Sequence, residues 1–111
     1  MQTEILLVVS NFPDHGTAQA AADFLVGNNL AACVNILPIC TSVYRWEGKI
    51  QQASEVPVLI KTTQAAYAKM EVALRELHPY ELPEIIAVPV TAGLPAYLNW
   101  VRQETQPRNN E

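Results

Sequence analysis

The sequence predicts an α+β fold of the ferredoxin-like class, in the order strand, helix, strand, strand, helix, strand, with one further helix at the end. Two segments carry apolar residues at helical spacing, and apolar, β-branched runs flank each of them. A tight turn at residues 46–49 joins the two middle runs into a hairpin. We therefore expect a single domain over residues 1–106, with an antiparallel four-stranded sheet and two helices on one face, and a polar tail over residues 107–111.

The first strand is expected over residues 4–10, an apolar run that is typical of a central strand covered on both faces. Residues 11–16 contain proline, glycine and asparagine and predict a loop. Thr17 is placed to cap the helix that follows, and Asn28 and Asn29 end that helix. Its apolar stripe faces the core.

The middle of the chain, residues 31–62, predicts an unusually long hairpin. Its first arm would reach about 50 Å if it were straight, whereas a domain of this length has a radius of gyration of about 13 Å. The arm must therefore bend, for which Pro38 and Pro57 are suitable positions, or leave its own domain. The outer part, with Tyr44 and Trp46, is too apolar to stand alone in water. We predict a long, bent hairpin that pairs with another copy of the chain.

The second helix is expected after Thr63 and is stopped by His78, because the proline that follows restrains it. A strand over residues 82–90 and a terminal helix over residues 96–105 complete the fold. The alternating directions of these elements place three segments at one end of the domain. These are the loop after the first strand, the hairpin and the loop around His78.

Composition limits the classes of function. The net charge of −4, with basic residues scattered singly, argues against nucleic acid as a partner. No apolar run reaches the roughly 20 residues of a membrane span. The start of the chain lacks the features of a signal peptide, so we expect a cytoplasmic protein. Half of the residues are hydrophobic and 16% are charged, which suits a compact protein that hides surface in an oligomer.

Two cysteines lie on the first arm of the hairpin. Seven residues of strand separate Cys33 from Cys40 by roughly 20 Å, far beyond disulfide reach. We therefore expect no bridge between them. Cys33, in an apolar frame, is expected to be a small core residue, and Cys40, near the bend, to be more exposed.

His15 and His78 are the candidate metal ligands at the shared end of the domain, because histidine is the commonest transition-metal ligand in proteins. The chain has no HExxH or CxxC pattern to strengthen this interpretation. The alternatives are that His78 caps the last carbonyls of its helix and that His15 is a solvated loop residue. Glu81 and Glu84 lie nearby and are expected to point into solvent. No nucleophile accompanies either histidine, so the sequence does not predict an enzyme.

Aromatic residues at two places are candidates for contacts between subunits. Tyr44 and Trp46, near the hairpin turn, favour interface anchors over a ligand cage. Tyr97 and Trp100, three residues apart on the last helix, are expected to pack on the sheet or on a neighbour.

Several motifs together resemble the CutA divalent-cation tolerance family over nearly the whole chain. They are Leu-Ala-Ala-Cys-Val-Asn at 30–35, Tyr-Arg-Trp-Glu-Gly-Lys at 44–49, His-Pro-Tyr at 78–80, Pro-Glu-Ile at 83–85 and Tyr-Leu-Asn-Trp at 97–100. The resemblance implies a stable homotrimer of ferredoxin-like subunits, held by pairing of the long hairpin between subunits. It also implies a role in tolerance to divalent metals, with copper binding as the reported activity. The trimer resembles the PII signalling proteins in architecture.

The family's metal pattern is incomplete in this chain. Bacterial relatives carry a cysteine at the end of the first strand and two histidines before Pro-Tyr, and the matching residues here are Ser10, Leu77 and His78. A copper or other divalent-cation site on His78 thus needs His15, a carboxylate or another subunit to complete it.

An alternative function follows from the same resemblance. It is a non-enzymatic trimeric sensor or scaffold that binds a small ligand or a protein in the clefts between subunits. By resemblance Glu55 and Lys61 lie in or near those clefts, or form an ion pair at the interface. The full set predicted for the cleft or interface is Tyr44, Trp46, Glu55, Lys61, Tyr80 and Trp100.

Overall fold

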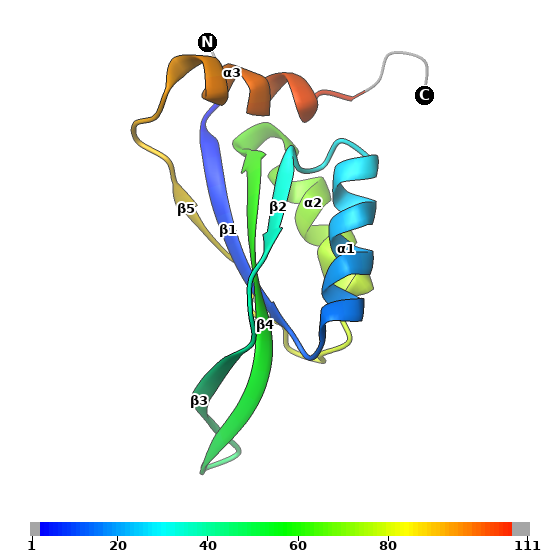
Figure 1. The fold of residues 1–111 in the computed structure, drawn as a ribbon, viewed down its shortest axis with the longest axis vertical. Coiled ribbons are helices and arrows are strands. Elements are labelled where there is room, and N and C mark those ends of the chain that lie inside the picture. The colour runs from blue at the N-terminus through cyan, green and yellow to red at the C-terminus, as the bar shows by residue number, and fades with distance from the viewer. Residues whose placement is uncertain (1–2, 108–111) are drawn as a thin grey trace.

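A computed structural model of the protein describes residues 3–107. Its elements are β1 (Ile5–Phe12), α1 (His15–Gly27), β2 (Cys33–Ile36), β3 (Cys40–Trp46), β4 (Lys49–Thr63), α2 (Gln64–Leu77), β5 (Ile86–Pro89) and α3 (Pro95–Glu104). The strands pair in the antiparallel order β2-β4-β1-β5, and β3 pairs with the outer part of β4. Helices α1 and α2 lie on one side of the sheet, α3 crosses one end, and the β3–β4 hairpin projects beyond the other (Figure 1). The predicted α+β fold is confirmed.

Strand β4 organises the sheet. Its residues from Val56 onward pair with β1, and β2 pairs on the other side, whereas its outer residues pair with β3 alone. The predicted bend occurs at Pro38, which lies between β2 and β3. Pro57 does not interrupt β4, and its carbonyl accepts a 2.9 Å hydrogen bond from the Leu37 amide.

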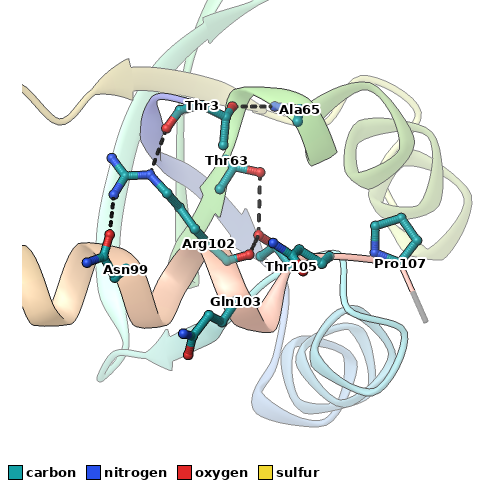
Figure 2. A pocket seen from close by; sticks show the side chains of 9 residues that line it. Thr3, Thr63, Ala65, Asn99, Arg102, Gln103, Thr105 and Pro107 are labelled. Carbon is teal, nitrogen blue, oxygen red and sulfur yellow. Dashed lines mark hydrogen bonds between the residues drawn. The ribbon is translucent and has the colours of Figure 1, made fainter. Parts of the chain in front are cut away.

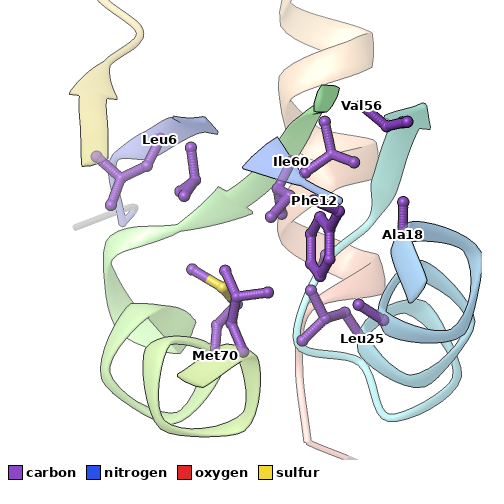
Figure 3. Packing of buried hydrophobic residues seen from close by; sticks show 12 residues of the cluster. Leu6, Phe12, Ala18, Leu25, Val56, Ile60 and Met70 are labelled. Carbon is purple, nitrogen blue, oxygen red and sulfur yellow. The ribbon is translucent and has the colours of Figure 1, made fainter. Parts of the chain in front are cut away.

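The core fills the space between the sheet and the first two helices. Phe12 and Ile60 project from the sheet toward Leu25 of α1 and Met70 of α2 (Figure 3), and all four side chains are buried. Each such side chain contributes about 1.5–3 kcal/mol through its removal from water. This core fixes the directions of β1, β4 and α2, whose ends carry the candidate functional residues.

The opposite face of the sheet is covered only in part. Leu7, Val9 and Leu59 are half-buried there, and Ile86 and Val88 of β5 are exposed. A separate small cluster, formed by Ile5, Ala32 and Val101, packs α3 against the end of this face. The expectation that the first strand is covered on both faces is therefore not met within one chain. We call this uncovered surface the open face.

Several predicted boundaries need correction. Helix α1 begins at His15, because Asp14 and not Thr17 is its N-cap, and the Asp14 carboxylate accepts the Thr17 amide at 2.8 Å. His15 is therefore a residue of the first helical turn and not of the loop. Strand β5 covers only Ile86–Pro89, because these are the residues that pair with β1.

The second and third helices agree more closely with prediction. Thr63 caps α2, and His78 follows as its C-cap, as the proline signal predicted. Apart from Pro107, the predicted polar tail at 107–111 lies outside the described residues. Among residues 3–107, none of the helices has the length and apolar character that a membrane crossing requires.

Candidate functional site

His78 lies at the end of α2, where the body of the protein meets the hairpin. Its ring is 7% exposed and stacks on Phe12, with ring centroids 4.2 Å apart. The Tyr80 amide donates to Nδ1 at 3.2 Å, so Nδ1 carries no proton. Nε2 therefore holds the ring hydrogen and donates it to the Asn11 carbonyl at 2.8 Å. Both nitrogens of the neutral ring are occupied by contacts within the chain.

The surroundings of His78 favour this neutral form. Burial lowers the pKa of His78, and the Asn11 carbonyl and the Glu55 charge oppose that effect. The ring thus joins the end of β1 to the loop after α2. It does more than cap its helix, and no pattern in the sequence indicates its contact with Asn11.

The residues predicted as metal ligands do not form a metal site within one chain. His78 has no lone pair left for a metal in this arrangement, and His15 is an exposed residue at the start of α1. Among residues 3–107, no group of three or more histidine, cysteine, aspartate or glutamate side chains converges to hold an ion. A copper site needs such convergence of nitrogen or sulfur ligands. The assignment of His78 and His15 to a metal stays a prediction.

The two departures from the family's metal pattern have different surroundings. Ser10 is fully buried, and its Oγ has no hydrogen-bond partner among the described residues. Leu77 is partly exposed at the end of α2 and offers no donor atom. Neither position supplies a strong ligand for a soft metal.

A groove of about 780 Å³ opens between the base of the hairpin and the loop after α2. Tyr44 and Trp46 line it from β3, Glu55 from β4 and Tyr80 from the loop. The Tyr80 hydroxyl donates to Glu55 Oε2 at 2.9 Å. Burial, together with the Glu55 carboxylate, raises the pKa of Tyr80 to about 12, so the hydroxyl keeps its proton at neutral pH.

Two acidic residues that sequence reasoning set aside also line this groove. Glu81 and Glu84 are exposed, as expected, but both face the groove and not only bulk solvent. Glu84 Oε1 accepts a hydrogen bond from the Asn11 side chain at 2.8 Å. Their position after Pro-Tyr was visible in the sequence, yet their convergence with the hairpin depends on the tertiary fold.

The other predicted cleft residues lie elsewhere. Lys61 is on the open face, where its ammonium group hydrogen-bonds Asn35 and lies 3.9 Å from the Cys33 sulfur. Cys33 is thus half-buried beside a charge, which corrects the prediction of a core residue. Trp100 contacts Tyr97 on α3, with ring centroids 5.5 Å apart, at the end of the molecule away from the hairpin. Cys33 and Cys40 are both free.

A second cavity, of about 610 Å³, lies beside α3 (Figure 2). Arg102 Nε donates to the Thr3 carbonyl at 3.0 Å, and Nη1 donates to Asn99 Oδ1 at 2.9 Å. The hydroxyls of Thr63 and Thr105 lie 3.5 Å apart. These polar groups hydrogen-bond one another and hold α3 against the end of the sheet. The cavity therefore lies in a structural contact between α3 and the sheet.

Comparison with known proteins decides the family. Residues 6–104 match the family model described as CutA1 divalent ion tolerance protein. The chain belongs to the CutA1 family. The resemblance predicted from its motifs is confirmed, and the match runs from β1 to the end of α3.

Relatives of known sequence or structure agree. The divalent-cation tolerance protein CutA of Thermus thermophilus is 42% identical over 105 residues, which are 95% of this chain and 99% of the relative. The crystal structure of CutA from Xylella fastidiosa superposes with a TM-score of 0.91 at 43% identity and covers 94% of this chain and 100% of that one. The chain spans about half the length of the mouse and human relatives, each named Protein CutA.

A structure from Archaeoglobus fulgidus, with a TM-score of 0.88 and 31% identity over 92% of this chain and 99% of that one, is described as a periplasmic divalent cation tolerance protein CutA. The cytoplasmic location of the present chain therefore stays a prediction.

Proposed function

We propose that this CutA1-family protein acts in divalent-cation tolerance as a non-enzymatic homotrimer whose ligand-binding surface is the groove at the base of the hairpin. The observation that carries the proposal is the exposure of the outer hairpin. Val43 is 65% exposed and Ile50 69%, and the hairpin projects beyond the body of the chain (Figure 1). An isolated two-stranded hairpin with apolar side chains is marginally stable in water, so cover from another copy favours it.

Two uncovered surfaces on one chain support a closed ring. The outer hairpin is one, and the open face, with Leu7, Val9 and Leu59, is the other. In a heterologous arrangement the hairpin of each subunit packs against the next subunit. The ring closes when the hairpin of the last subunit packs against the first. The expectation of three subunits comes from the family resemblance.

The ligand of the groove is open between two classes. The metal hypothesis, copper included, needs ligands from a second subunit, because within residues 3–107 of one chain no three ligating side chains come together. The hypothesis of a PII-like sensor or scaffold needs only a cavity near an interface. The groove meets that need, because it combines Tyr44, Trp46, Glu55 and Tyr80, all predicted for the cleft. This observation favours the sensor hypothesis for this chain.

Assembly is tested by sedimentation equilibrium of the wild type and of two matched variants. Val43→Glu places a charge on the exposed outer hairpin, and Val72→Glu places the same charge at a 55% exposed position of α2. Neither valine is in the core, so both variants should fold. We expect a trimeric mass for the wild type and for Val72→Glu, and dissociation of Val43→Glu. A monomeric wild type, or equal assembly of both variants, contradicts the proposal.

The metal hypothesis is tested by calorimetric titration of Cu²⁺ into the wild type, His78→Gln and His15→Gln. Saturable binding near one ion per subunit, lost in either variant, would assign that histidine as a ligand in the assembly. Equal binding by all three proteins would remove both histidines from the metal hypothesis, and no saturable binding by the wild type would contradict the copper assignment.

A further inference from the structure

We propose that the groove at the base of the hairpin binds a linear aliphatic polyamine, and this assignment rests on the groove's being a ligand site of the proposed trimer. The groove combines aromatic walls with separated carboxylates, and none of the described lysines and arginines lines it. That combination matches a flexible chain of methylene groups that carries several positive charges.

The aromatic walls come from three side chains. Tyr44 and Trp46 lie on one strand of the hairpin, and Tyr80 faces them from the loop after α2. Aromatic faces attract ammonium groups through their quadrupoles, and they also pack against methylene groups. The Tyr80 side chain is held in place by its 2.9 Å hydrogen bond to Glu55, so this wall is preorganised.

The carboxylates supply charge complementarity. Glu55 accepts a hydrogen bond from the Tyr80 hydroxyl through one oxygen, and Glu84 accepts one from the Asn11 side-chain amide. Each carboxylate retains a second oxygen for a ligand. Glu81 makes no hydrogen bond or ion pair to the described residues. Three of the eleven acidic residues of the chain, whose net charge is −4, therefore border one cavity.

The spacing of these carboxylates favours a polyamine over a single metal ion. Among residues 3–107 the three carboxylates do not converge on a point from which one ion could be coordinated. Apolar residues such as Val43, Ala53 and Leu82 line the same cavity. A compact divalent ion could not meet all three carboxylates together, whereas ammonium groups separated by methylenes can meet several and place their apolar spacers on the walls. The volume of about 780 Å³ suits a ligand of this size.

The test is calorimetric titration of spermidine into the wild-type protein, with Mg²⁺ and pentane-1,5-diol as the compact-cation and neutral comparators. We expect saturable binding of spermidine alone. Glu81→Gln should weaken it about fivefold, the size of one exposed ion pair. Glu76→Gln, an equal change of charge at an exposed position of α2 outside the groove, should leave it unchanged.

A spectroscopic readout places the ligand. Trp46 and Trp100 are the two tryptophans of the chain, so in a Trp100→Phe background the fluorescence reports on Trp46 alone. Spermidine should change that emission with the same midpoint as the heat signal. No saturable binding, an unchanged Trp46 emission, or equal weakening by Glu76→Gln overturns the polyamine site.

Failure of this inference is distinguishable from failure of the proposed function. Sedimentation of the same wild-type sample decides the trimer whatever the titration gives. A trimer that does not bind spermidine overturns the polyamine assignment alone, whereas a monomer overturns the proposed assembly.

Discussion

The two halves of β4 experience opposite environments. From Val56 to Thr63 the strand has β1 on one side and β2 on the other, and alternate side chains are fully buried under the helices. From Lys49 to Glu55 it pairs with β3 alone, and no side chain is buried. One continuous strand is thus a core element at one end and a surface element at the other.

The contrast shows that strand formation and burial are separate properties. The inner half has five β-branched residues and the outer half has Ile50 alone, yet both halves are strand, and only the inner half obtains its stability from its own chain. The outer half keeps its hydrogen-bond ladder but lacks a second layer, so its apolar residues are available to a partner. The groove borders the outer half, which contributes Ala53 and Glu55 to its lining.

The largest difference is expected between two isoleucines of β4. Ile60→Ala removes a 0% exposed side chain of the inner half and should lower the free energy of unfolding by about 3 kcal/mol, because it leaves a cavity. Chemical denaturation at several protein concentrations measures the change, which should be present at all of them.

Ile50→Ala is the matched change in the outer half, at a 69% exposed position. Its effect should vanish at concentrations where the protein is dissociated and appear only in the assembly. An equal, concentration-independent loss from both substitutions would mean that the outer half is stabilised within its own chain.

The next effect concerns the pH dependence of stability. It depends on His78, which stacks on Phe12 opposite Val56, the first residue of the inner half. Unfolded His78 titrates near its ordinary pKa of 6.5, and burial lowers the pKa in the folded protein. Between these values the unfolded chain binds more protons, so stability should fall as pH decreases from 6.5 through the lower folded pKa, and be fully present above 6.5. Denaturation midpoints between pH 5 and 8 check the slope.

His78→Phe should flatten this slope, because the ring can still stack on Phe12 but cannot titrate. His15→Gln removes the other, exposed histidine and should retain the wild-type slope. A slope that survives in His78→Phe would assign the pH dependence to other groups.

The smallest effect is expected for the hydrogen bond from Tyr80, in the loop after α2, to Glu55, at the base of the hairpin. Tyr80→Phe deletes the hydroxyl that donates to Glu55 and should cost about 1 kcal/mol. Tyr97→Phe deletes an exposed hydroxyl on α3 and should cost nothing measurable. Equal losses from the two substitutions would show that the bond to Glu55 does not fasten the hairpin.

Local patterns predicted the elements well where one local cause dominates. The helical spacing before His78 and the proline after it located the end of α2, and the turn at 46–49 located the hairpin. Prediction was poorer where two local signals compete. Asp14 and Thr17 are both good N-caps, and only the backbone path after Phe12 selects Asp14.

The sequence by itself determined the family and the order of the elements, because these depend on motifs, on periodicity and on the chemistry of single residues. It offered both Pro38 and Pro57 for the bend, and the tertiary structure selected Pro38. Tertiary structure alone decided that both nitrogens of His78 are occupied and that Glu81 and Glu84 border the groove. The physical reason is that hydrogen bonds and cavities join residues far apart in the chain, such as Asn11 and His78. Their distances are set by packing of the whole sheet and not by any local pattern.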